Sequence, residues 1–128
     1  MNNYRELKVW NEAMALVSEV YSVLKEFPNF ERYALADQIR RSSISVPSNI
    51  AEGSARHSQR EFYRFLGIAS GSLAELSTQI EISRRLNYLT EENFVKLNHH
   101  CESLHKMLYK LQATVKASIE NQNLRTKN

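Results

Sequence analysis

The segment "SVPSNIAEGSAR", residues 45–56, decides the fold of this chain. It contains a proline, an asparagine and a glycine, which are typical of loops, yet it lies between two long stretches with helical periodicity. Two structures fit it. In the first, one helix runs from about residue 31 through Pro47, kinks there and ends at Gly53. In the second, a new helix begins at Pro47 with Ser45 as its N-cap.

The hydrophobic spacing around the proline favours the first structure. Leu35, Ile39, Val46 and Ile50 are separated by 4, 7 and 4 residues, and Ser43 occupies the missing step. This stripe keeps its phase across the proline, which a true break between helices would not require. An interior proline costs about 3 kcal/mol and leaves the carbonyl four residues earlier without its donor. We therefore predict a continuous but kinked second helix.

Steps of three and four residues mark three further amphipathic helices. The first helix has its stripe at Leu7, Trp10, Met14, Val17, Tyr21 and Leu24. The third and fourth have theirs at Phe62, Leu66, Ala69, Leu73, Leu76 and Ile80, and at Phe94, Leu97, Cys101, Leu104, Leu108, Leu111 and Val115. The predicted helices are about 4–26, 31–53, 58–86 and 91–119, and a frayed tail is expected over 120–128.

Capping residues support these boundaries. Ser58 and Glu61 have the spacing of a capping box, and Thr90 is a suitable N-cap for the last helix. Asn87 follows two arginines and tolerates the left-handed conformation of a helix end. Long helices joined by short connections predict one domain, residues 1–128, with an all-α, antiparallel up-down-up-down four-helix bundle.

Composition indicates the cellular compartment. The 128 residues carry a net charge of +3 and include one cysteine, Cys101, so no internal disulfide is possible and a reducing compartment is indicated. No apolar run approaches the roughly 20 residues of a membrane span. The N-terminus lacks the apolar core of a signal peptide. We expect a cytoplasmic protein without a membrane partner.

The motifs of catalysis and metal binding are weak. Glu102 and His105 have the Glu-x-x-His spacing of bundle metal sites, but a di-iron site needs this motif twice. Both residues flank the apolar stripe, which favours a surface pair. Cys101 lies on the stripe and is expected to be a small buried residue. No serine nucleophile motif or phosphate-binding glycine loop occurs. We expect no enzyme activity, no cofactor and no metal.

Basic residues are the candidate binding residues. Residues 40–64 contain five arginines and only two acidic residues. These arginines, which form a candidate nucleic-acid-binding patch, are Arg40, Arg41, Arg56, Arg60 and Arg64. The alternative is a solvated face held together by salt bridges.

Three features suggest assembly. The small residues from Gly67 to Gly71 favour close backbone approach, either within the bundle or between subunits. Tyr33, Ile44 and Ala51 form apolar surface outside the main stripe of the second helix. The first helix carries an acidic flank that is suited to head-to-tail contact with basic flanks of another copy. Its members are Glu12, Glu19 and Glu26.

A family resemblance rests on three stretches: "LKVWNEAM", "QIRRSSISVPSNIAEGSAR" and "EFYRFLGIASGSLAELSTQIEISRRLNYL". Their order and spacing resemble the 23S rRNA-intervening-sequence proteins, over about residues 4–120 and most strongly over 39–89. Ala34 and Asn87 stand where the family often has glycine, and both fit the helical interpretation.

The resemblance implies a left-handed four-helix bundle, often a homopentamer, and defines no catalytic residues. The family is also similar to the accessory protein of diversity-generating retroelements, a basic pentameric barrel that binds nucleic acid and a reverse transcriptase. We therefore expect a homo-oligomer that binds RNA or DNA phosphates, with a preference for structured RNA and little sequence specificity. The alternative is a protein–protein adaptor whose arginines lie in subunit contacts.

Overall fold

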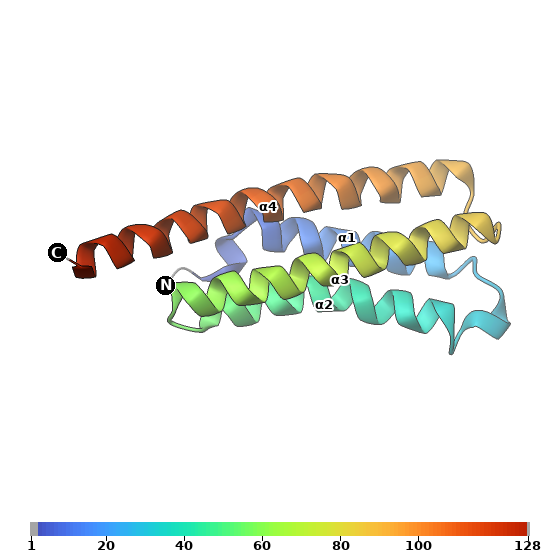
Figure 1. Cartoon of the computed structure of the whole chain (residues 1–128). Coiled ribbons are helices and arrows are strands. Elements are labelled where there is room, and N and C mark those ends of the chain that lie inside the picture. The colour runs from blue at the N-terminus through green and yellow to red at the C-terminus, as the bar shows by residue number, and fades with distance from the viewer. Residues whose placement is uncertain (1–2, 128) are drawn as a thin grey trace.

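The chain forms a bundle of long helices with two short 3-10 helices (Figure 1). The computed structural model describes residues 3–127, with side chains to residue 126. Within this range there is no strand. The elements are η1 (Tyr4–Glu6), α1 (Lys8–Leu24), η2 (Asn29–Glu31), α2 (Leu35–Ala55), α3 (Gln59–Arg85) and α4 (Glu91–Lys127).

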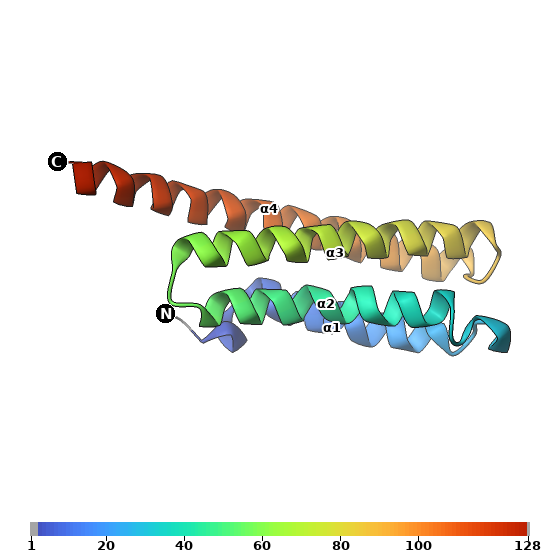
Figure 2. The same cartoon turned by 60° about the horizontal axis from the view of Figure 1, so that its bottom comes forward.

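Each long helix packs against two others. In Figures 1 and 2 successive helices run in opposite directions, and the C-terminal part of α4 extends past the end of the other three. α1 and α3 each lie against both α2 and α4. None of the helices among the described residues has the length and apolar character needed to cross a bilayer.

The predicted stripes of α2, α3 and α4 form the core. Every predicted position of α3 is buried, as are Ile39, Val46 and Ile50 of α2. In α4 the stripe from Leu97 to Val115 is buried except for the half-buried Leu111. The all-α bundle is therefore confirmed, and its core lies where the heptad spacing predicted it.

The predicted core stripe of α1 is wrong by one position. The buried residues are Val9, Ala13, Leu16, Val20 and Val23. The predicted stripe lies beside them on the lateral face, with Met14 and Tyr21 exposed and the others half-buried. α1 thus has two adjacent apolar stripes. The one with smaller side chains enters the core, and the one with larger side chains lies at the surface.

α2 continues through Pro47 from Leu35 to Ala55. A separate helix capped by Ser45 is therefore wrong, because Ser45 lies inside α2, where its Oγ is 2.8 Å from Ser72 Oγ of α3. Asn49 Nδ2 also donates to the Ser45 carbonyl at 2.8 Å. The start of α2 is later than predicted, because η2 and the turn that follows it occupy residues 29–34. The kink at Pro47 stays a prediction.

Gly53 does not end α2, contrary to the prediction, but lies buried within it. A Cβ atom at Gly53 would lie 2.6 Å from Phe65 Cβ and 3.2 Å from Phe62 Cδ1, both on α3. The missing side chain therefore lets the ends of α2 and α3 approach closely. The helix itself ends two residues later, at Ala55.

The predicted N-cap residues and the left-handed Asn87 are confirmed, whereas the second half of the capping box does not form, because the Glu61 carboxylate binds Arg64 and Ser58 N donates to the Arg56 carbonyl. Ser58 Oγ accepts from Glu61 N at 3.3 Å, Thr90 Oγ1 accepts from Asn93 N at 3.1 Å, and Asn87 has a φ of 63°. The predicted end of the last helix at residue 119 is wrong, because α4 continues to Lys127. The segment after residue 119 contains no proline or glycine, so the helix persists although the apolar pattern has stopped.

Candidate nucleic-acid interface

Arg56 and Arg64 lie at the junction of α2 and α3, where carboxylates hold both guanidinium groups. Arg56 Nη2 is 3.0 Å from Glu52 Oε1, and Arg64 Nε is 2.9 Å from Glu61 Oε2. The hydrogen bond from Arg64 holds the pKa of Glu61 below its ordinary value. Glu61 is therefore ionised at neutral pH, and Glu52 and Glu61 offset part of the positive charge of these two arginines.

Arg60 differs from its two neighbours because its partner is neutral. Its Nη2 donates to Asn123 Oδ1 of α4 at 3.1 Å. This contact ties the extended end of α4 to the start of α3 without cancelling the positive charge. Of the three arginines at this junction, Arg60 is the one whose charge is not offset by a carboxylate in these contacts, so it is the best placed to bind an external phosphate.

Arg40 and Arg41 form a second group near the start of α2. At a rise of 1.5 Å per residue, Arg41 and Arg56 are about 22 Å apart along the helix. Arg41 Nε is 2.9 Å and Arg40 Nη2 is 3.6 Å from the Asp37 carboxylate. The hydrogen bond from Arg41 lowers the pKa of Asp37. The five candidate arginines therefore form two groups rather than one patch.

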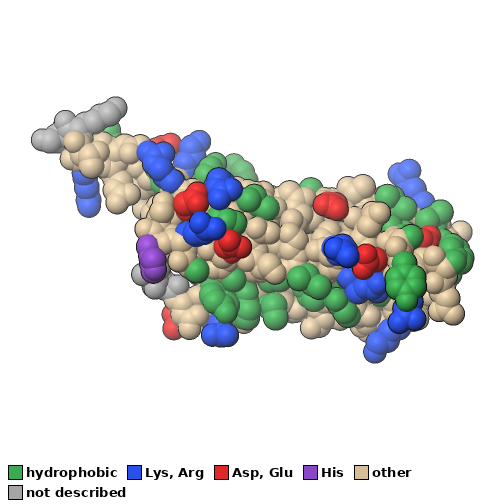
Figure 3. Space-filling view, turned by 90° about the horizontal axis from the view of Figure 1, so that it is seen from below, with side chains coloured by type: hydrophobic (Ala, Val, Ile, Leu, Met, Phe, Trp, Pro, Cys, Tyr) green, Lys and Arg blue, Asp and Glu red, His purple; other side chains and the backbone are tan. Residues whose placement is uncertain are grey.

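An apolar groove lies between these two groups on the face shared by α1 and α2. Figure 3 shows basic and acidic side chains near both ends of this face and a band of hydrophobic side chains between them. Met14 and Ile44 are each 43% exposed there. The groove has a volume of about 320 Å³ and is lined by Tyr4, Trp10, Met14, Val17, Ile44, Pro47, Ser48 and Ala51. We call it the α1–α2 groove.

Gly67 and Gly71 face outward from α3. A Cβ at Gly71 would have no heavy atom within 4 Å, and one at Gly67 would meet only Gln112 Nε2 at 3.8 Å. Close packing within the bundle therefore does not explain Gly71. The alternative, approach by another subunit, stays a prediction.

The acidic flank of α1 is engaged by α4 of the same chain. His100 Nδ1 is 2.8 Å from Glu19 Oε2, and His100 Nε2 is 3.5 Å from Glu12 Oε2. Asn93 Nδ2 donates to Glu26 Oε2 at 3.3 Å. This role of His100 was not predicted from the sequence, although His100 precedes Cys101 and so lies beside the apolar stripe of α4.

The two metal candidates, Glu102 and His105, have different surroundings. Glu102 is exposed and accepts a hydrogen bond from Asn98 at 3.1 Å, while burial lowers the pKa of His105. Among the described side chains, no three His, Cys, Asp or Glu residues come together in a group that could hold a metal ion. Cys101 is 1% exposed, and its burial raises its pKa to about 11. Its predicted role as a small core residue is confirmed.

The sequence pattern of the 23S rRNA-intervening sequence proteins matches residues 5–110. This chain belongs to that family. The family match includes both arginine groups and the residues of the α1–α2 groove, apart from Tyr4, whereas the extended end of α4 lies outside it.

A solved structure shares the fold. It is the crystal structure of a protein of unknown function from the S23 ribosomal protein family of Bacteroides thetaiotaomicron VPI-5482. The two chains are 24% identical with a TM-score of 0.75, and the match covers 81% of this chain and 97% of the other. A search of curated proteins found no match. The family match therefore identifies the family, and the crystal structure shows a second protein with the same fold.

Proposed function

We propose that this protein is a non-catalytic, oligomeric nucleic-acid-binding protein that contacts the phosphate backbone of structured RNA. The observation that carries the proposal is the presence of one arginine group near the start of α2 and another at its end. Two groups about 22 Å apart can contact phosphates that are well separated on a folded RNA. Phosphate contacts alone position a protein without reading bases, so little sequence specificity is expected.

Assembly is part of the proposal. The α1–α2 groove exposes large apolar side chains that a second copy can bury, and the family resemblance favours five copies. A ring would present the arginine groups repeatedly, and each copy would contribute a net charge of +3. Such repetition strengthens weak contacts through effective concentration. We place the assembly in the cytoplasm, as the single cysteine suggests.

A protein–protein adaptor is the second candidate. Two observations favour it: the ion pairs that partly neutralise the arginines, and the apolar surface between them. In this alternative the groove binds a different protein, for which the family resemblance suggests a reverse transcriptase. The arginines would then lie in contacts between subunits.

The test replaces the arginines at the α2–α3 junction. The variant Arg56→Gln, Arg60→Gln, Arg64→Gln is expected to bind every RNA more weakly and to lower the salt slope of binding by up to roughly 2.7, because each phosphate contact contributes about 0.9. Fluorescence anisotropy over a series of salt concentrations measures this. The fold should persist, because Arg56, Arg60 and Arg64 are all exposed.

A matched control removes the same charge elsewhere. It carries Arg85→Gln, Lys96→Gln and Lys106→Gln at exposed positions of α3 and α4. The control should change affinity only slightly. If the arginine variant binds RNA like the wild type but dissociates into monomers, the arginines are subunit contacts and the adaptor function is favoured.

A further inference from the structure

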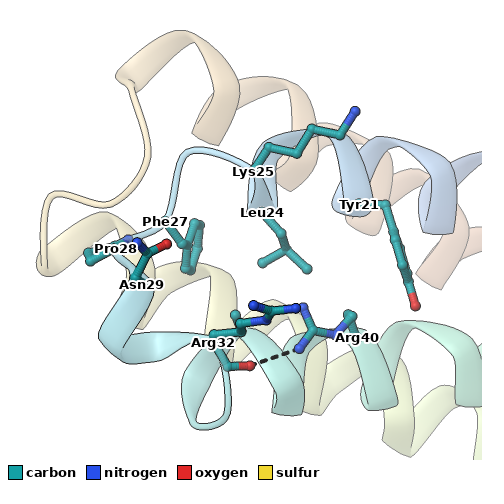
Figure 4. A pocket seen from close by; sticks show the side chains of 9 residues that line it. Tyr21, Leu24, Lys25, Phe27, Pro28, Asn29, Arg32 and Arg40 are labelled. Carbon is teal, nitrogen blue, oxygen red and sulfur yellow. Dashed lines mark hydrogen bonds between the residues drawn. The ribbon is translucent and has the colours of Figure 1, made fainter.

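A second basic feature lies where α1 ends and α2 begins. A cleft of about 320 Å³ opens there (Figure 4). Its lining residues include three cations and no acidic residue; they are Tyr21, Leu24, Lys25, Phe27, Pro28, Asn29, Arg32, Ala36 and Arg40. The proximity of Lys25 and Arg32 to Arg40 depends on the turn between α1 and α2, so the sequence alone does not predict it.

Two guanidinium groups converge in this cleft. Figure 4 shows the side chains of Arg32 and Arg40 pointing toward one another, with Lys25 extending away from them at the rim. Arg40 is held in place, since its Nη2 donates to the Arg32 carbonyl at 2.8 Å and lies 3.6 Å from Asp37 Oδ1.

Arg32 has no carboxylate partner among the described side chains, and its guanidinium lies 5.5 Å from the ring centre of Tyr33. Asp37 pairs with Arg40, and it is shared with Arg41. Two like charges that face each other repel, and an anion between them removes the repulsion. The planar donors of two arginines also match phosphate oxygens.

The shape of the cleft limits the ligand. Its volume lies at the lower end of the range of small-molecule sites. A cleft of this size is too small for a duplex but can hold the end of one strand. Pro28 and Asn29 line one side, and Leu24 and the 42%-exposed Tyr21 offer an apolar wall on another. Ala36, in the first turn of α2, also lines the cleft.

We propose that this cleft binds the terminal phosphate of a nucleic-acid strand, with Arg32 and Arg40 holding the phosphate and Tyr21 contacting the first nucleoside. A terminal phosphate carries nearly two negative charges at neutral pH, whereas an internal phosphodiester carries one. Two converging arginines therefore favour the terminal group. This inference deepens the proposed function and rests on it, because it names one part of the nucleic acid that the protein recognises.

The experiment compares single-stranded RNA oligonucleotides of one sequence that differ only at their ends. The arms are a 5′-phosphate, a 3′-phosphate and hydroxyl groups at both ends, with inorganic phosphate as a competitor. Wild-type protein is expected to prefer one phosphorylated end over the hydroxyl form by about tenfold or more. Comparison of the first two arms shows which end the cleft accepts.

Arg32→Gln is expected to abolish this preference, and Arg32 is the better probe because its side chain holds no other element in place. Arg85→Gln, at an exposed position on α3, serves as the matched control and should keep the preference. The variant with Arg56, Arg60 and Arg64 changed to Gln should weaken binding to all oligonucleotides but leave the ratio between them unchanged.

The outcomes separate the two proposals. If the wild type binds hydroxyl-ended RNA with salt sensitivity but shows no end preference, or if Arg32→Gln keeps the preference, the cleft proposal is overturned and the proposed function stands. If neither hydroxyl-ended RNA nor a structured RNA hairpin binds, yet a nucleoside 5′-monophosphate binds and Arg32→Gln abolishes this, the phosphate site is supported and the proposed function fails.

Discussion

Gly53→Ala is expected to lower the free energy of unfolding by about 1–3 kcal/mol, although alanine is the better helix former. The new Cβ would lie 2.6 Å from Phe65 Cβ, which is attached directly to the backbone of α3 and has no rotamer that avoids the contact. α2 and α3 would therefore have to separate. Urea unfolding followed by circular dichroism, at one fixed protein concentration, measures the change.

Gly71→Ala is the matched control for this prediction. A Cβ there meets no atom of the same chain within 4 Å, so at a protein concentration low enough for the monomer the substitution should raise the free energy of unfolding by about 0.5–1 kcal/mol through helix propensity alone. If both substitutions stabilise the protein equally, the close approach of α2 and α3 at Gly53 is not required.

Met14→Glu combined with Ile44→Glu is expected to dissociate the proposed oligomer. Both side chains lie in the α1–α2 groove and are 43% exposed, so charged replacements are tolerated in a single chain. Within a subunit interface, each carboxylate would be buried without a partner, at a cost of several kcal/mol. The dissociation constant should therefore rise by at least about a hundredfold.

Light scattering at micromolar concentration measures this effect, because a monomer has a mass of 14.9 kDa. Ile82→Glu is the control: Ile82 is 42% exposed on α3, outside the groove. This variant should assemble like the wild type. A wild type that is already a monomer, or a double variant that still assembles, would show that the groove does not join subunits.

The sequence predicted most of the fold because heptad spacing and caps are local. Leu66, Leu73 and Leu104 are fully buried, as their stripes indicated, and Ser58 caps α3 as expected. The same reasoning predicted the wrong buried stripe for α1, because two apolar stripes lie side by side along this helix. Periodicity locates each stripe, but the partner helices decide which one is buried.

The candidate site was less accessible to sequence reasoning. The run of arginines predicted one basic patch, but it did not reveal that Glu61 pairs with Arg64 or that Arg60 contacts Asn123 of α4. The convergence of Arg32 and Arg40 depends on the path of the chain through η2, which no repeat encodes. Such long-range or turn-dependent geometry requires the folded structure.

The most direct test of phosphate binding is the salt dependence of wild-type binding to a structured RNA hairpin and to a second hairpin of unrelated sequence. We expect the logarithm of the association constant to fall linearly with the logarithm of salt concentration, with a slope of at least roughly 2.7 in magnitude and similar affinity for both hairpins. The absence of salt-sensitive binding at about 50 mM salt would contradict the account.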